Sequence, residues 1–183
     1  LFGAAEASIA YTLAAIKDKD TSVLITGETG TGKEVIATYL HYHSVRRARP
    51  FIAVNCAAIP QDVMERELFG SRGATGQSFH HGFAERARSG ILFLDEISEL
   101  SLHLQAKLLR LVEAREFHRV GGEQQVEFRG RIVCATNQDL PSMVAKGSFR
   151  RDLYYRINSA VVNVPRCMIL EVVQSMISWP KSV

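Results

Sequence analysis

The stretch Gly27-Glu28-Thr29-Gly30-Thr31-Gly32-Lys33 decides the fold of this chain. It follows the apolar run SVLIT (22–26) and leads directly into EVIATYL (34–40), whose apolar residues have helical spacing. Glycines at such a turn let the backbone wrap around an anion, and amide N–H groups converge at the start of the helix. The lysine adds a positive charge where β- and γ-phosphates would lie. We therefore expect a nucleoside triphosphate cradle here rather than an ordinary glycine-rich turn.

The phosphate loop lacks the usual hydroxyl ligand of Mg²⁺, and an acidic pair elsewhere in the chain is expected to take over this function. Glu34 follows Lys33 where phosphate loops usually carry Ser or Thr, so the usual hydroxyl ligand of Mg²⁺ is absent. Asp95 and Glu96 end the apolar run ILFL (91–94). We expect Asp95 to orient the Mg²⁺ shell through water and Glu96 to polarise the water that attacks the γ-phosphate. Without the phosphate loop, the same pair would read equally well as acids favourable at a helix N-terminus.

The rest of the chain alternates between strand-like and helical patterns. Five short apolar runs lack strict alternation, which is typical of strands covered on both faces of a parallel sheet: 23–26, 51–54, 91–94, 131–135 and 161–164. Leucines at 100, 104, 108 and 111 fall on one face of a helix that Ser98 or Ser101 would cap. This alternation predicts an α/β domain with a doubly wound parallel sheet. Three longer loops, 69–82, 121–130 and 139–148, are the places where function is expected.

Composition bounds the remaining possibilities. The 183 residues are 46% hydrophobic, enough for the core of one domain, and a net charge of +3 does not predict DNA binding by bulk charge. No apolar run approaches the length of a membrane span, and the start of the chain lacks the pattern of a signal peptide. Cys56, Cys134 and Cys167 are too few and too scattered for a disulfide framework or a zinc site. We expect a cytoplasmic protein without membrane contact.

The motifs together resemble the AAA+ ATPase domain of bacterial enhancer-binding proteins, the sigma-54-dependent transcriptional activators. Seven segments follow that family's order: GETGTGKE, PFIAVNCAAIP, ELFG, ILFLDEI, EFHRVGG, ATNQDL and FRRDLYYRIN. The resemblance covers residues 1–165. It implies a three-layer P-loop AAA+ sandwich with a five-stranded parallel sheet. It also implies a homo-hexameric ring whose Mg²⁺-dependent ATP hydrolysis remodels the sigma-54 RNA polymerase holoenzyme.

The resemblance also assigns roles that the residues alone leave open. Asn55 matches the switch asparagine that holds Glu96 away from the attacking water, although by itself it reads as a turn residue. Asn137, after Thr136, matches the sensor that reads the γ-phosphate, although an asparagine capping a turn is unremarkable.

Two arginines match the family's arginine fingers. Arg150 and Arg156 would each reach into the site of a neighbouring protomer and stabilise charge on the transferring phosphoryl group. Spacing alone favours a different interpretation, a solvated basic helix face on which Asp152 pairs locally.

The sequence departs from the family's pattern at two places, the loop that contacts sigma-54 and residues 166–183. The loop that contacts sigma-54 carries Gly-Ala-Phe-Thr-Gly-Ala in the family, whereas residues 71–78 read SRGATGQS, without the aromatic and with Gln77 in place of the last Ala. Residues 166–183 do not resemble the family's helical lid and form an atypical tail. No DNA-binding domain is recognisable, so DNA would be contacted only through domains outside these residues. Two hypotheses remain: an ATP-hydrolysing regulator domain with a defective sigma-54 loop, or a degenerate or truncated nucleotide-binding interaction module that neither hydrolyses ATP nor activates sigma-54.

Overall fold

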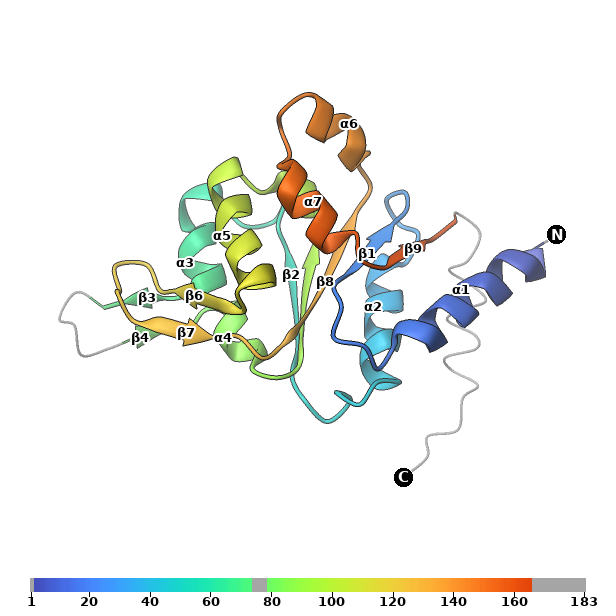
Figure 1. The fold of residues 1–183 in the computed structure, drawn as a ribbon, viewed down its shortest axis with the longest axis horizontal. Helices are drawn as coiled ribbons and strands as arrows, with labels where there is room; N and C mark the ends of the chain where they lie inside the picture. The colour runs from blue at the N-terminus through green and yellow to red at the C-terminus, as the bar shows by residue number, and fades with distance from the viewer. Residues whose placement is uncertain (1, 74–78, 166–183) are drawn as a thin grey trace.

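The computed structural model describes residues 2–73 and 79–165 (Figure 1). Its helices are α1 (Phe2–Ile16), α2 (Lys33–Tyr42), α3 (Gln61–Phe69), α4 (Phe83–Ala87), the 3₁₀ turn η1 (Ile97–Glu99), α5 (Leu102–Glu113), α6 (Leu140–Ala145) and α7 (Arg151–Ile157). Its strands are β1 (Val23–Thr26), β2 (Phe51–Asn55), β3 (Ser71–Arg72), β4 (Phe79–His80), β5 (Ile91–Asp95), β6 (Glu116–His118), β7 (Gln125–Glu127), β8 (Arg131–Thr136) and β9 (Val161–Asn163).

The central sheet has five parallel strands in the order β2-β5-β8-β1-β9. These are the five apolar runs of the sequence, so the predicted α/β class and the parallel sheet are confirmed. Strands β5 and β8 are buried along almost their whole length, because helices cover both faces of the sheet. The carboxyl ends of β1, β5 and β8 therefore meet at one edge, which is where an open α/β sheet places its ligand.

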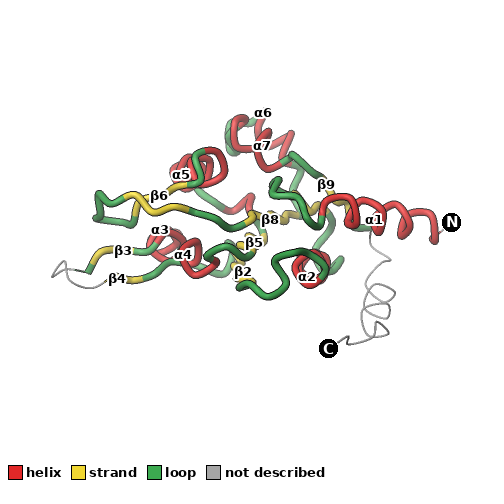
Figure 2. Tube along the Cα trace, turned by 60° about the horizontal axis from the view of Figure 1, so that its bottom comes forward, coloured by secondary structure: helices red, strands yellow, loops and turns green. Residues whose placement is uncertain are grey.

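Helices pack on both faces of the sheet and give three layers (Figures 1 and 2). One core lies between the sheet and α3, α5 and α7, and it contains Leu104, Leu108 and Leu111 of the predicted helix face. The other core lies under α1 and α2. Ser101 caps α5 by accepting a hydrogen bond from the Leu104 amide, whereas Ser98 lies in η1.

The three predicted loops contain regular structure. The first includes the antiparallel pair β3 and β4, and the second includes β7, which pairs with β6 to form a hairpin. The third includes the short helix α6, with Asp139 at its N-cap and Pro141 in its first turn. Six residues give too little periodicity to reveal such a helix in the sequence. The altered part of the sigma-54 loop (74–78) and the tail (166–183) lie outside the described residues.

A buried arginine fixes the end of α1 to the sheet. Arg131 opens β8 with its side chain fully buried, and its guanidinium donates to the carbonyls of Ile16, Lys17 and Thr21 at 2.8, 2.9 and 3.0 Å. Burial lowers the pKa of Arg131 to about 10, which leaves it charged at neutral pH. None of the described helices is long and apolar enough to cross a bilayer.

Candidate nucleotide-binding site

The phosphate loop runs from the end of β1 to the first residue of α2. Gly30 and Gly32 both have φ of +81°, a left-handed conformation that side chains disfavour. A Cβ built on Gly27 would come within 2.6 Å of the Val164 carbonyl oxygen and 2.8 Å of the Thr31 hydroxyl. Among the described residues no side chain caps α2 at Gly32, so its first-turn amides face the loop. The three glycines thus shape a backbone cradle that suits phosphate oxygens.

Lys33 is held inside this cradle. Its side chain is 6% exposed, and its ammonium donates to the carbonyls of Gly27 and Glu28 at 3.1 Å each. The same nitrogen lies 3.7 Å from Oε1 of Glu96. Two neutral carbonyls and one carboxylate therefore position the charge that the sequence assigned to the phosphates.

Glu96 adopts a backbone conformation that is rare for its residue type. Its φ of 51° and ψ of 52° are left-handed, which costs a non-glycine residue of order 1–3 kcal/mol. The Asp95 carboxylate accepts a hydrogen bond from the Glu96 amide at 3.0 Å and thereby supports the turn. The conformation brings the Glu96 side chain back over the carboxyl edge of the sheet, towards Lys33.

The segment at the end of β8, which contains the predicted sensor Asn137, joins the same site. The Asn137 amide N–H lies 3.3 Å from Oε2 of Glu96, and its side-chain Nδ2 donates to the Thr29 hydroxyl at 2.7 Å. The Thr136 hydroxyl donates to Ser98 Oγ at 3.2 Å, which links β8 to the turn after Glu96. The structure thus brings together the phosphate loop, the acidic pair and the predicted sensor residue.

Asn55 lies beside this group without a hydrogen bond to it. It ends β2 in register with Asp95, but its side-chain Oδ1 accepts a hydrogen bond from the Ala57 amide at 2.9 Å. The interpretation as a turn residue is therefore what the structure displays, and the switch role remains a prediction.

The two candidate finger arginines are placed on and beside α7 with acidic partners of their own chain. Arg150 pairs with Asp152 through two hydrogen bonds of 3.0 and 2.7 Å, and Arg156 Nε bonds to Glu113 of α5. The Arg150 side chain is 39% exposed and that of Arg156 is 61% exposed. The bond to Arg150 lowers the pKa of Asp152. An open hollow of about 420 Å³ lies over Arg150, Asp152 and Tyr155.

The site offers one carboxylate of suitable chemistry to a nucleotide-borne Mg²⁺. Asp95 lies at the carboxyl end of β5, half-buried, whereas Glu34 is exposed in the first turn of α2. The described residues contain no group of three metal-ligating side chains. This donor set fits an ion whose other ligands are phosphate oxygens and water, with Asp95 acting through a water molecule.

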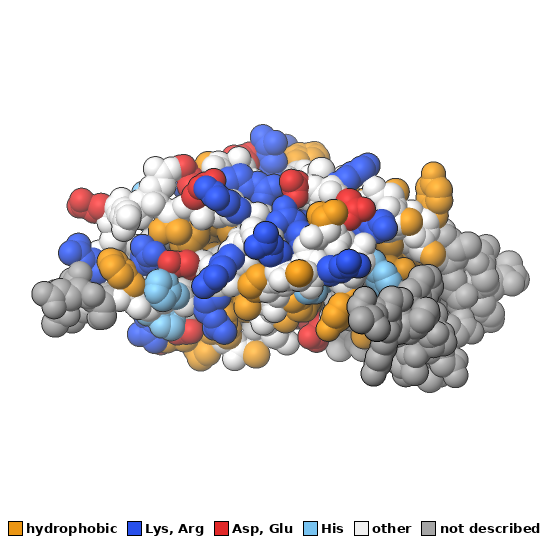
Figure 3. Space-filling view, turned by 90° about the horizontal axis from the view of Figure 1, so that it is seen from below, with side chains coloured by type: hydrophobic (Ala, Val, Ile, Leu, Met, Phe, Trp, Pro, Cys, Tyr) orange, Lys and Arg blue, Asp and Glu red, His pale blue; other side chains and the backbone are white. Residues whose placement is uncertain are grey.

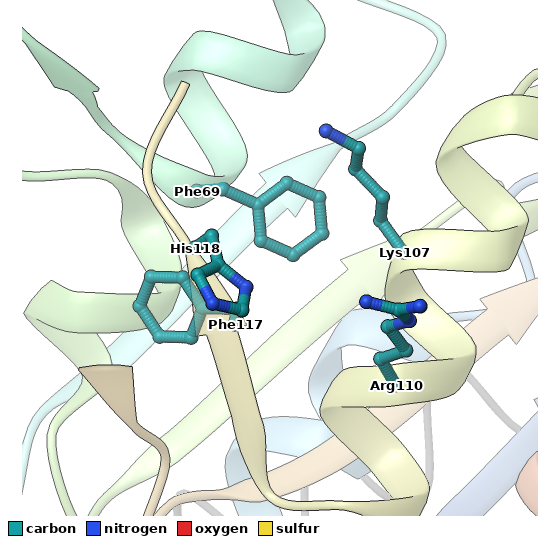
Figure 4. Close-up of a pocket in the computed structure, with 5 residues that line it drawn as sticks. All are labelled: Phe69, Lys107, Arg110, Phe117 and His118. Atoms are coloured by element: carbon teal, nitrogen blue, oxygen red, sulfur yellow. The ribbon is translucent and has the colours of Figure 1, made fainter. Parts of the chain in front are cut away.

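Other surface features add nothing to this site. Figure 3 looks from below at the opposite edge of the sheet, where Lys and Arg side chains gather. Several are already paired, including Arg46 with Asp20 and Arg129 with Glu127. A separate pocket of about 110 Å³ lies between the end of α3, α5 and β6 (Figure 4), lined by Phe69, Lys107, Arg110, Phe117 and His118.

One buried polar residue escaped the sequence analysis. Gln105 is fully buried in α5, where its side chain bonds to the backbone of Leu100, Ser148 and Arg150. In the sequence, the one indication that Gln105 is buried is its place beside the leucine stripe of the helix. The sequence does not predict its hydrogen-bond partners.

The fold and this site define a P-loop domain of the AAA+ type. A family model described as the Sigma-54 interaction domain matches residues 4–163. The chain is 56% identical over 140 residues to the regulatory protein AtoC of Escherichia coli K12. This alignment covers 75% of this chain and 30% of AtoC. It is 52% identical over 151 residues to the Nif-specific regulatory protein of Azotobacter vinelandii, covering 80% of this chain and 28% of that protein.

Solved structures give the same result. NtrX of Brucella abortus superposes with a TM-score of 0.83 at 38% identity, covering 88% of this chain and 37% of NtrX. NtrX has also been solved in complex with ADP and with ATP. This chain therefore belongs to the Sigma-54 interaction domain family, and it spans less than a third of the length of the two regulators named above.

Proposed function

We propose that this chain is the ATP-binding and ATP-hydrolysing domain of a sigma-54-dependent transcriptional regulator, working with Mg²⁺ in a homo-oligomeric ring. The observation that carries the proposal is the contact of Glu96 with both Lys33 and Asn137. Three motifs far apart in the sequence thereby meet at the carboxyl edge of one sheet. The ADP and ATP complexes of NtrX support a nucleotide as the ligand.

The chemistry needs positioning and charge more than covalent participation. Glu96 orients the attacking water and accepts its proton, and the Lys33 ammonium stabilises charge on the β- and γ-phosphate oxygens. Bound Mg²⁺ would neutralise phosphate charge, with Asp95 orienting its water shell. Asn137 connects the γ-phosphate end of the cradle to Glu96 through its backbone amide.

The arginines complete the site from a neighbouring copy. Arg150 and Arg156 bond to Asp152 and Glu113 of their own chain on an exposed surface. An exposed ion pair contributes little stability. The phosphate of a nucleotide bound by the adjacent protomer can therefore replace the acidic partner with a small loss of free energy. This arrangement supports a ring, of six protomers by resemblance to the family, in which each protomer completes its neighbour's site.

The contact with sigma-54 is weakened by the loop sequence between Ser71 and Ser78. The aromatic that the family presents to sigma-54 is missing there. Phe79, which follows this loop, is 46% exposed and has the Arg119 guanidinium 4.8 Å from the centre of its ring, and it is the candidate to replace that aromatic from another place. We expect little stable complex with sigma-54 in the presence of a transition-state mimic of ATP. Inserting Phe between Ala74 and Thr75, together with Gln77→Ala, should increase the complex. A robust complex with the unaltered chain would contradict this part of the proposal, and its loss in Phe79→Ala would assign the contact to Phe79.

The ATPase proposal is tested by two variants that separate binding from chemistry. Lys33→Ala should lose binding of a fluorescent ATP analogue, because it removes the charge at the phosphates. Glu96→Gln should bind the analogue as the parent chain does but release no phosphate. A parent chain that binds but hydrolyses no faster than Glu96→Gln, at every protein concentration, would instead establish a nucleotide-binding interaction module.

A further inference from the structure

The buried side-chain amide of Gln105 bonds to the turn that follows Glu96 and to the backbone on both sides of Phe149, including that of Arg150. Gln105 lies in α5 with no exposed surface. Its Nε2 donates to the Leu100 carbonyl at 2.7 Å and to the Ser148 carbonyl at 3.2 Å. Its Oε1 accepts the Arg150 amide at 2.8 Å. The side chain therefore uses both donors and one acceptor on three separate backbone positions.

The first of these positions belongs to the turn that follows the acidic pair. The Glu99 amide donates to the Glu96 carbonyl and the Leu100 amide to the Ile97 carbonyl, so η1 connects Glu96, its N-cap, directly to Leu100, its C-cap. The Leu100 carbonyl then receives the Gln105 amide. The backbone of Glu96 is therefore connected to the Gln105 side chain through a single turn.

The other two positions set the start of α7. Ser148 and Arg150 flank Phe149, which is buried. Arg150 is the N-cap of α7, so its own amide has no acceptor within the helix, and Gln105 supplies one. The Arg150 side chain is 39% exposed and bonds to Asp152 at the start of α7, and the backbone from which it extends is held by Gln105.

We infer that Gln105 is a positioning residue that couples the nucleotide site of one protomer to the arginine which that protomer provides to its neighbour. This inference rests on the proposed function, since it requires Arg150 to act in trans. The inference goes beyond the proposed function because it assigns the connection between the nucleotide sites of adjacent protomers to one buried side chain outside both sites. Losing the link should reduce the finger's contribution without affecting the phosphate loop of the same chain.

The test is directional complementation in mixtures of full-length variant chains. Gln105→Met keeps the side-chain length and removes all three bonds. We expect its ATP turnover to fall about 100-fold, the scale of a misplaced reacting group, with KM nearly unchanged. Mixed with Lys33→Ala, whose arginine is intact, it should regain turnover. Mixed with Arg150→Ala, it should regain none, because both chains then lack a working finger.

The controls separate the failure of this inference from failure of the proposed function. Gln61→Met is the matched control, because Gln61 donates to the Glu99 carbonyl at 2.7 Å from an exposed position and makes no bond to Arg150. It should behave as the parent chain. The reference mixture, Arg150→Ala with Lys33→Ala, tests trans catalysis itself. If the reference fails, the trans arrangement is overturned and the inference with it.

If the reference succeeds but Gln105→Met recovers with neither partner or with both, Gln105 does not act through Arg150 and the inference is overturned. Binding of a fluorescent ATP analogue by Gln105→Met, at the affinity of the parent chain, checks that its own site is folded. Should Gln105→Met fail to fold, Gln105→Asn retains the buried amide but shortens its reach, and the same directional pattern is expected from it.

Discussion

The Lys33 ammonium lies 3.7 Å from the Glu96 carboxylate, at the edge where β1 and β5 end. In the proposed function, the pair joins the charge that would receive phosphate to the acid that would orient water. It is nearly buried, with the two side chains 6% and 17% exposed, so solvent screens it less than the surface pairs of α7. Lys33 and Glu96 are therefore electrostatically coupled, and a change in one should affect the other.

Replacing Glu96 by Gln should stop hydrolysis while leaving the site assembled. The amide oxygen of Gln can still accept the Asn137 N–H, but it cannot take a proton from water. We expect kcat to fall about 10²–10⁴-fold, the range of a general base, with the Kd for nucleotide little changed. Phosphate release and analogue titration measure the two quantities. A variant that keeps more than a tenth of parent turnover would remove Glu96 from its role.

The switch role of Asn55 can be isolated with an isosteric change. Asn55→Asp retains an oxygen to accept the Ala57 amide, so the turn after β2 and the unfolding temperature should be preserved. The change replaces the amide that the family resemblance directs at Glu96 with a like charge. We expect turnover to change while thermal stability does not. Unchanged turnover in a folded Asn55→Asp chain would leave Asn55 as a turn residue only.

The sequence predicts some parts of the fold and of the candidate site but not others. The phosphate loop and the acidic pair follow from local patterns, because strand, glycines and lysine are consecutive. The five sheet strands follow from short apolar runs. By contrast, α6 and the β3–β4 pair are too short for periodicity. The bonds of Gln105 depend on segments over 40 residues apart, which only the folded chain brings together.

Stability should depend strongly on one buried cation. Arg131→Met keeps much of the side-chain volume but leaves the carbonyls of Ile16, Lys17 and Thr21 without their donor. Only the bond to Ile16 is buried and the other two are partly buried. An unsatisfied buried group costs about 1–3 kcal/mol, so we expect a loss of at least about 1 kcal/mol in the free energy of unfolding. Urea denaturation measures it. Arg129→Met is the control, since Arg129 pairs with Glu127 at the surface. Equal losses for both variants would contradict the helix-anchoring role of Arg131.

The two buried thiols should be unreactive in the folded chain. Burial first, and then the charge of Asp95, raises the pKa of Cys56 to about 12, and burial raises that of Cys134 further. Both stay protonated well above neutral pH, so little nucleophilic thiolate forms. In a Cys167→Ser chain we expect no alkylation at pH 8 until urea unfolds the protein. Rapid native labelling at Cys56 would show that its environment is more open than described.

ATP turnover per protomer, measured with Mg²⁺ as a function of protein concentration, tests the central claim most directly. Glu96→Gln provides the blank. If Arg150 and Arg156 complete sites between copies of the chain, the rate per protomer rises with concentration and then levels off as rings fill. A rate that stays at the blank across the whole range would contradict the account and leave a nucleotide-binding module without catalysis.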